Sequence, residues 1–254
     1  MKYDLIIDSR PTEVALALLR DGLLIEFHKE KHDNDFSVGD IYLAKVRKTV
    51  PGLNAAFVNV GYERDGFLHY LDLGAHYNSY KKFTNQAINQ KLNTASLKNF
   101  KKEKTLDKDG SINNVIKSGD LLLTQISKEP ISTKGPRLTT EISLAGRYMV
   151  LLPFSDKVSI SQKIDDSKEQ SRLKKLIRSI KPHGFGVIIR TVAKDKKVAE
   201  LDRDLKNLYK KWQLITKNLK NAKPKSKIHG ELNKASTILR DLLGEKFNKI
   251  QVNN

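Results

Sequence analysis

Residues 39–68 constrain the fold more than any other part of the chain. The segment reads GDIYLAKVRKTVPGLNAAFVNVGYERDGFL, in which short apolar runs alternate with turns at Pro51-Gly52, Gly61 and Asp65-Gly66. Short strands at such close spacing are typical of small closed β-barrels of the OB type. The segment therefore predicts a small β-barrel.

Strand alternation separates two kinds of side chain within this segment. Successive side chains of a strand point to opposite faces, so Phe57 and Asn59 share one face. The opposite face carries Ala56, Val58 and Val60. Phe57 therefore has a polar amide as its neighbour, which predicts that its ring lies outside the barrel.

A second ring follows the same rule a few residues later. Phe67 and His69 lie on the face opposite to Leu68, so Phe67 also has a polar neighbour. Two exposed rings suit stacking of nucleic-acid bases, which contributes ~1–3 kcal/mol per base. Cationic side chains close by in the sequence could pair with phosphates, namely Lys45, Arg47 and Arg64. The pattern alone leaves open that one or both rings close the edge of the core.

The charge of the chain indicates the same class of partner. Its 254 residues contain 47 Lys and Arg against 29 Asp and Glu, a net charge of +18. A basic surface attracts polyphosphates because counterions are released on binding. Nucleic acid is therefore the first candidate partner, and the alternative is an evenly spread lysine coat that only solvates the protein.

Several functional classes are excluded by what the sequence lacks. The chain contains no cysteine, which excludes disulfides, thiolate nucleophiles and cysteine-built zinc sites. The apolar run Leu5 to Ile7 ends at Asp8 and is too short for a signal-peptide core, and no run approaches the ~20 apolar residues of a membrane span. We expect a soluble, cytoplasmic protein without a membrane partner.

The remaining elements predict an α+β fold. Strands are expected over residues 3–8, 13–19, 23–27, 121–126, 139–152 and 187–192. Asp166 with Glu169 forms a capping signature for a helix that runs to about Lys181. Apolar residues spaced three and four apart from Val198 to Leu219 predict a long amphipathic helix over 196–220, whose stripe is expected to pack on its own sheet rather than to form a dimer.

Residues 76–118 differ in composition from their surroundings. They contain nine Lys against three acidic residues, together with seven Asn. Such a segment has few large apolar side chains with which to bury a core. It is predicted to be a flexible, basic insertion that forms a solvated loop.

An ordered set of motifs resembles the ribonuclease E/G family, in particular its ribonuclease G-like members. The motifs are GDIY at 39–42, AAFVNVG at 55–61, RDGFL at 64–68, TKG at 133–135, LTT at 138–140, ISLAGRY at 142–148, VLLP at 150–153 and GVIIRT at 186–191. The resemblance covers nearly the whole chain. The sequence departs from the family pattern at two places. Pro136-Arg137 replaces small residues, and the 76–118 insertion is longer than expected for the family.

The resemblance implies a domain organisation. Residues 1–35 and 195–254 would form a split ribonuclease-H-like subdomain. Residues 36–128 would form the OB-fold RNA-binding domain, with the basic insertion 76–118 inside it. Residues 129–194 would form an α/β segment that senses the 5′ end of RNA.

The resemblance also implies site residues. The family's positions for sensing a 5′-monophosphate match Gly146, Val150, Arg190 and Thr191. Arginine can bind a phosphate with two parallel hydrogen bonds, and glycine permits close approach of the backbone. The family's RNA contacts match Phe57, Phe67 and Lys134, although Lys134 could also be a surface lysine beside the Gly135-Pro136 turn.

The implied activity belongs to the full-length family enzyme. Such an enzyme would use Mg²⁺ to cleave single-stranded RNA in rRNA processing and RNA decay, and the resemblance allows oligomerisation of the full-length protein. The family's magnesium-binding aspartates and zinc-binding cysteines lie downstream of the segment matched by 249–254, so no catalytic or metal-binding residue is assigned to this chain. Asp8 and Asp202 are considered as independent catalytic acids and are not favoured.

Two other functions stay open. The chain could be a naturally short, non-catalytic RNA-binding protein that masks 5′ ends. It could also be a general basic protein whose binding ignores the 5′ group.

Overall fold

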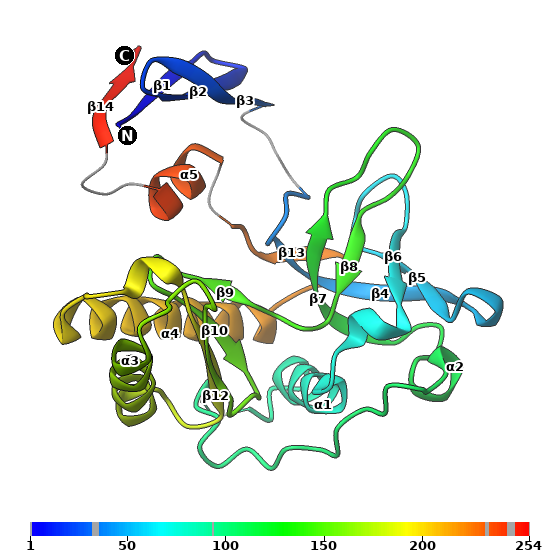
Figure 1. The fold of residues 1–254 in the computed structure, drawn as a ribbon. Coiled ribbons are helices and arrows are strands. Elements are labelled where there is room, and N and C mark those ends of the chain that lie inside the picture. Colours follow the sequence, from blue (N-terminus) through cyan, green and yellow to red (C-terminus); the bar gives the residue numbers. More distant parts are fainter. Residues whose placement is uncertain (1, 32–35, 93, 232–233, 243–246, 254) are drawn as a thin grey trace. The chain divides into compact units, whose positions relative to one another are not determined.

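The computed structural model describes residues 2–31, 36–92, 94–231, 234–242 and 247–253 (Figure 1). The chain separates into two compact units. The smaller unit contains residues 1–35 together with 231–254, and the larger unit contains residues 36–230.

The smaller unit joins the two ends of the chain in one sheet. Its strand order is β14-β1-β2-β3, with β14 parallel to β1 and the other pairs antiparallel. The strands are β1 (Tyr3–Ser9), β2 (Glu13–Arg20), β3 (Leu23–Lys31) and β14 (Phe247–Val252). Asp21 and Gly22 adopt positive φ angles of 50° and 83° in the turn between β2 and β3. Leu5, Leu16 and Ile238 of helix α5 (Lys234–Leu242) form the unit's core.

The larger unit contains the predicted barrel. Its strands are β4 (Ile41–Val50), β5 (Ala55–Asn59), β6 (Gly66–His69), β7 (Leu121–Lys128) and β8 (Arg137–Thr139). They pair in the order β4-β5-β6-β8-β7, and the additional pairing of β4 with β7 closes the ring. β13 (Ser226–His229) extends the sheet along β4. The mixed α+β fold with a closed five-stranded barrel is consistent with the predicted OB-like fold.

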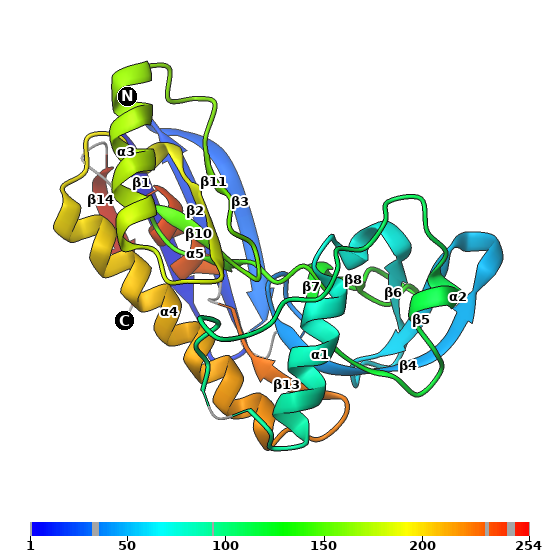
Figure 2. The same ribbon diagram turned by 90° about the horizontal axis from the view of Figure 1, so that it is seen from below.

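The larger unit also contains a second sheet, which is covered by two long helices and is called the second sheet below. The strand order is β11-β12-β10-β9. The strands are β9 (Leu144–Ala145), β10 (Met149–Pro153), β11 (Val158–Ile160) and β12 (Phe185–Ile189), and the helices are α3 (Ser167–Ile180) and α4 (Val198–Lys220). Figure 2 shows α4 running beside β10.

The amphipathic stripe of α4 lies in the core from Leu201 onward, as its spacing predicts, whereas Val198 at the first position of the helix is 50% exposed. The stripe is buried at Leu201, Leu205, Leu208, Trp212, Ile215 and Leu219. The predicted helix after Asp166 is also confirmed, because the Asp166 carboxylate accepts hydrogen bonds from the backbone N–H groups of Lys168 and Glu169. α4 belongs to the larger unit, and the assignment of 195–254 to a ribonuclease-H-like subdomain stays a prediction.

Residues 76–118 are not the solvated loop that their composition predicts. Helix α1 (Tyr77–Ile88) buries Tyr80 and Phe83 in the same core as α4, and the Tyr80 hydroxyl donates to the Ile142 and Pro153 carbonyls. A short helix, α2 (Ile112–Val115), follows later. The prediction is wrong here because the aromatic residues, although few, recur at helical spacing within the lysine-rich sequence.

Candidate nucleic-acid interface

The two predicted rings are neighbours on the outside of the barrel. Phe57 on β5 lies directly opposite Phe67 on β6. Their centroids are 6.0 Å apart with the planes at 70°. Both side chains are partly exposed, whereas the alternate residues Ala56 and Leu68 are fully buried in the barrel core. The alternation therefore gives the correct face for both rings.

These rings line an open pocket of about 580 Å³, which we call the aromatic pocket. Its lining residues are Lys48, Phe57, Arg64, Asp65, Phe67, Thr133, Lys134, Gly135 and Arg137. The Lys48 ammonium lies 5.6 Å from the centroid of the Phe57 ring, within the range of a cation–π interaction. The structure thus brings Lys134 together with both rings.

Gly135 explains how the loop bearing Lys134 reaches the barrel. A β-carbon at Gly135 would lie 2.1 Å from the Asp65 carbonyl oxygen, so only glycine permits this approach. The loop is closed by backbone hydrogen bonds in both directions between Ile131 and Lys134, of 3.2 and 2.9 Å. Lys134 is therefore held beside the rings by the backbone of its own turn.

The cations around the aromatic pocket differ in how they are paired. Arg137 makes two hydrogen bonds of 3.0 Å to the Asp72 carboxylate. These bonds and the charge of Asp72 raise the pKa of Arg137. Within the described residues, Arg64 and Lys134 form no salt bridge. These two positive charges are accordingly available to an anionic ligand.

Of the four predicted sensor residues, Val150 lies in strand β10, and Gly146, Arg190 and Thr191 lie in the segments that directly follow β9 and β12. Val150 pairs with Ile188 of β12 on one side and with Ala145 of β9 on the other. The Arg190 Nη1 donates to the Gly146 carbonyl oxygen at 2.8 Å. Thr191 follows Arg190 and is exposed, with its hydroxyl 2.8 Å from the Ser161 hydroxyl. The structure thus connects Arg190 to Gly146, and Thr191 contacts Ser161 instead.

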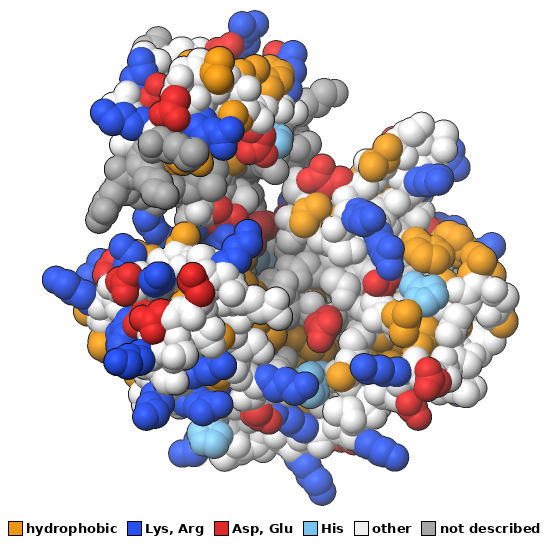
Figure 3. All heavy atoms as spheres, in the orientation of Figure 1, with side chains coloured by type: hydrophobic (Ala, Val, Ile, Leu, Met, Phe, Trp, Pro, Cys, Tyr) orange, Lys and Arg blue, Asp and Glu red, His pale blue; other side chains and the backbone are white. Residues whose placement is uncertain are grey.

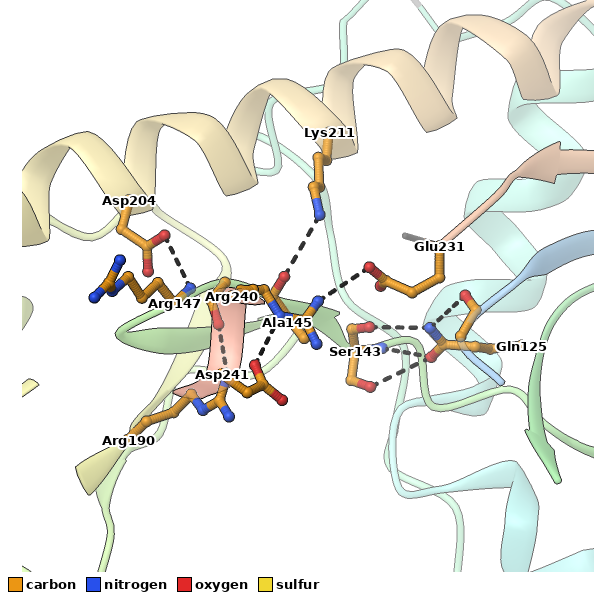
Figure 4. A network of polar contacts seen from close by, with 12 residues as sticks. Gln125, Ser143, Ala145, Arg147, Arg190, Asp204, Lys211, Glu231, Arg240 and Asp241 are labelled. Atoms are coloured by element: carbon orange, nitrogen blue, oxygen red, sulfur yellow. Dashed lines mark hydrogen bonds and ion pairs between the residues drawn. The ribbon is translucent and has the colours of Figure 1, made fainter. Parts of the chain in front are cut away.

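Asp204 of α4, a residue that no sequence motif indicated, holds the turn that contains Gly146. Its carboxylate accepts hydrogen bonds from the N–H groups of Arg147, Tyr148 and Met149, at 3.2, 2.9 and 3.2 Å. Figure 4 shows Asp204 pointing from the helix to this turn. A β-carbon at Gly146 would lie 2.7 Å from the Asp204 Oδ2. A carboxylate between Leu201 and Leu205 on the buried side of a helix was the signal that could have identified it.

A buried amide connects the barrel to the second sheet. Gln125 of β7 donates from Nε2 to the Gly39 and Ser143 carbonyls at 2.9 and 3.0 Å. Its Oε1 accepts from the Ser143 N–H at 2.9 Å (Figure 4). Because its amide is hydrogen-bonded through both its nitrogen and its oxygen, Gln125 fixes the segment that leads from the barrel into β9.

Positive charge is spread widely over the larger unit. Figure 3 shows Lys and Arg side chains both around the helices of the second sheet and around the barrel. The charge is therefore not confined to the aromatic pocket. The combination of cations with two outward rings distinguishes that pocket from the general basic surface.

Comparison with known proteins gives the family. The sequence profile described as the Ribonuclease E/G family matches residues 143–254. Ribonuclease G of Haemophilus influenzae is 32% identical over 251 residues, which is 99% of this chain. The chain belongs to the ribonuclease E/G family. Further members are similar to it, with ribonuclease G of Escherichia coli K12 31% identical over 254 residues, 100% of this chain, and ribonuclease E of Nostoc sp. 34% identical over 218 residues, 85% of this chain.

This member of the ribonuclease E/G family spans about half the length of the ribonuclease G relatives. It covers 47% of the Haemophilus influenzae protein and 48% of the Escherichia coli protein. It covers 28% of the Nostoc ribonuclease E. The match to the two ribonuclease G proteins includes both the barrel and the second sheet.

Carboxylates in this ribonuclease E/G chain do not gather into a metal site among the residues described. No group of three or more His, Asp or Glu side chains there could hold an ion. Asp8 pairs with Arg10 at 3.0 Å, and Asp202 pairs with Lys206 at 2.6 Å. The described residues therefore do not fit the Mg²⁺ that the family resemblance implies.

Among the helices of the described residues, none combines the length and the hydrophobicity of a membrane-spanning segment.

Proposed function

We propose that this chain is the RNA-binding and 5′-monophosphate-sensing region of a Mg²⁺-dependent endoribonuclease that acts on single-stranded RNA. The observation that carries the proposal is the aromatic pocket, where Phe57 and Phe67 adjoin Arg64 and Lys134, two cations that form no salt bridge with any residue the structure describes. Family membership supports RNA as the ligand.

The aromatic pocket suits a strand whose bases are unpaired. A base can stack on a ring only after it leaves the base stack of a duplex, so such sites select single strands. Both rings face outward next to cations that can neutralise the phosphates on either side of a stacked base. Stacking on a ring tolerates any base, and we therefore expect weak sequence preference.

The sensing step is assigned to Arg190, Thr191, Gly146 and Val150. A guanidinium that already donates to the Gly146 carbonyl is held in one orientation, which lowers the entropy lost when it binds phosphate. A terminal monophosphate carries more charge and more acceptor oxygens than a 5′-hydroxyl. The Arg190 charge and the Thr191 hydroxyl would therefore favour the monophosphate.

We further propose the domain organisation that the resemblance implies. Residues 36–128 act as the RNA-binding domain, to which residues 133–139 contribute a barrel strand and part of the aromatic pocket, and the rest of 129–194 acts as the sensor. A ribonuclease-H-like subdomain would be built from 1–35 and 195–254. The parallel pairing of β14 with β1, beside the antiparallel strands β2 and β3, supports a joint role for the two chain ends. Hydrolysis is a property of the whole enzyme in this proposal, and the described residues bind and position the RNA.

Fluorescence anisotropy tests the RNA-binding part of the proposal. A 5′-hydroxyl single-stranded RNA should bind wild type in preference to a duplex of the same sequence. Phe57→Ala should weaken that binding, while Leu71→Ala, which removes an exposed apolar side chain in the segment after β6, should not. Equal affinity of wild type and Phe57→Ala would refute the role of the aromatic pocket.

The same titration tests sensing when the RNA carries a 5′-monophosphate. Wild type should bind the monophosphate more tightly than the hydroxyl form, and Arg190→Gln should remove the difference. Arg178→Gln on the exposed side of α3 is the matched control. Equal binding of the two RNAs by wild type would contradict sensing and leave the aromatic pocket untouched.

A further inference from the structure

A β-bulge in β4 turns consecutive cations to the outside of the barrel. Lys45 pairs with Asn59 and Val46 with Val58, but the next pair is Lys48 with Phe57. Arg47 is the extra residue. Both Arg47 and Lys48 are therefore exposed, although they are adjacent in a strand, while Val46 is buried. Such a bulge redirects side chains that regular alternation would place on opposite faces.

Beside this bulge lies a second open hollow of about 370 Å³, which we call the Lys45 hollow. It is lined by Lys45, Val46, Arg47, Asn59, Ser118, Gly119 and Lys225. Three of these residues are cationic, and none is acidic. The hollow is thus a concave, positively charged site that the sequence motifs do not assign.

Lys225 reaches the hollow through two backbone contacts. Its N–H donates to the Leu43 carbonyl at 2.7 Å. Its carbonyl oxygen lies so close to Gly61 that a β-carbon there would be 2.8 Å away, and Gly61 has a φ of +97°. A residue from the segment before β13 is in this way fixed against strand β4 and the turn that follows β5.

Asn59 supplies a neutral donor at the same place. Its Oδ1 accepts from the Gly61 N–H at 2.8 Å, so the Nδ2 is the end of the amide left to donate. Only 9% of the residue is exposed, which keeps this amide in one orientation. A phosphate oxygen is the kind of acceptor that a fixed amide donor and lysine ammonium groups bind together.

The cations of the hollow are largely unneutralised. In the part of the chain that the structure describes, Lys45 and Lys225 form no ion pair. Arg47 is 3.4 Å from Asp65, and its side chain is 62% exposed. Such an exposed ion pair contributes little, so a phosphate can replace it at small cost.

Arg47 and Asp65 also connect the two sites. Asp65 lines the aromatic pocket, and its partner Arg47 lines the Lys45 hollow. Lys48, next to Arg47, lines the aromatic pocket as well. The backbone of an RNA strand whose bases stack on Phe57 and Phe67 can therefore continue along β4 into the Lys45 hollow.

We propose that the Lys45 hollow binds phosphodiester groups of the RNA strand, beyond the nucleotides held in the aromatic pocket. This proposal rests on the proposed RNA-binding function. The occupant is the backbone of the same strand, and its recognition is independent of base sequence.

The test compares two 5′-hydroxyl RNAs, of about four and about twelve nucleotides, both within the range of site sizes found on OB barrels. The variant is Lys45→Gln/Lys225→Gln, and the control is Lys175→Gln/Lys210→Gln on α3 and α4. Removal of two phosphate contacts should reduce the slope of log affinity against log salt by about 1.4 for the long RNA, and its affinity by about 10- to 30-fold at 0.1 M salt. The short RNA and the control variant should bind as in wild type.

Three results separate the possible failures. An unchanged salt slope for the long RNA, or equal weakening of both RNAs, would overturn the hollow as an extension of the RNA path. If inorganic phosphate shifts the NMR signals of Lys45 and Lys225 while the double variant affects the short and long RNAs alike, the Lys45 hollow is a site for free anions. That result would also overturn the proposal. Phe57→Ala that weakens neither RNA would instead refute the proposed function itself. Trp212 fluorescence during unfolding checks that each variant is folded.

Discussion

Replacement of Asp204 tests how the candidate sensor is held in place. Its carboxylate is the shared acceptor for the N–H groups of Arg147, Tyr148 and Met149 in the turn between β9 and β10. Asp204→Ala leaves these groups without that acceptor. We expect a lower free energy of unfolding for the larger unit and a weaker preference for 5′-monophosphorylated RNA, because Gly146 lies in the same turn.

The size of the effect follows from the three hydrogen bonds. A bond to a charged group contributes ~1.5–3 kcal/mol net when well formed. Asp204 is half-buried, and two of its bonds are 3.2 Å long, near the upper limit for good geometry. Water can replace part of what is lost. We therefore expect Asp204→Ala to cost about 2–3 kcal/mol in total, and Asp204→Asn, which keeps one acceptor oxygen, about 1 kcal/mol.

Urea unfolding followed by tryptophan fluorescence measures this effect in the correct unit. Trp212 is the only tryptophan of the chain, is fully buried on α4 and donates to the Ala95 carbonyl at 3.0 Å. Asp202→Ala on the same helix is the control, because it removes only an exposed pair with Lys206, worth about 0.3–0.5 kcal/mol. Equal unfolding free energies for Asp204→Ala and Asp202→Ala would refute the reasoning.

Three further predictions concern binding and stability. Phe57→Ala should weaken the binding of single-stranded RNA about 5- to 150-fold in anisotropy titrations. In the double variant, Phe67→Ala should weaken binding less than it does alone, because the two rings are in contact. Fully additive effects would argue against one base shared by both rings. Lys134→Gln should reduce the salt slope by about 0.7, and an unchanged slope would leave it a surface lysine. Hydrogen bonding from Arg172 lowers the pKa of Glu169 in the folded state. The ionised Glu169 therefore stabilises the fold above its unfolded pKa of about 4.3. This contribution is lost as the pH falls through the lower pKa of the folded state. The difference in unfolding midpoint between wild type and Glu169→Gln should therefore be constant near neutral pH and shrink below about pH 4.3, whereas a difference that grows in acid would contradict this.

Alternation and periodicity predicted the parts of the fold that depend on neighbouring residues. The outward faces of Phe57 and Phe67, the cap at Asp166 and the buried stripe of α4 each follow from residues a few positions apart. Lys134 needed the family resemblance, because it reaches the rings only through a loop packed against Asp65.

Other features depend on contacts that no local pattern contains. Lys48 was not predicted at the site, because regular alternation puts it on the inner face and only the bulge at Arg47 turns it outward. Asp204 acts through a turn 55 to 57 residues away. The helix α1 was hidden by the lysines around it, since average composition does not reveal that Tyr80 and Phe83 share one face.

Photo-crosslinking tests the central claim most directly, because it reports where RNA lies on the protein. A single-stranded RNA that contains 4-thiouridine is bound, irradiated and digested, and the crosslinked peptides are identified by mass spectrometry. We expect crosslinks within residues 57–67 and 133–137, the two segments that contribute most of the lining of the aromatic pocket. Crosslinks confined to α3 and α4, with none in those two segments, would contradict the central claim.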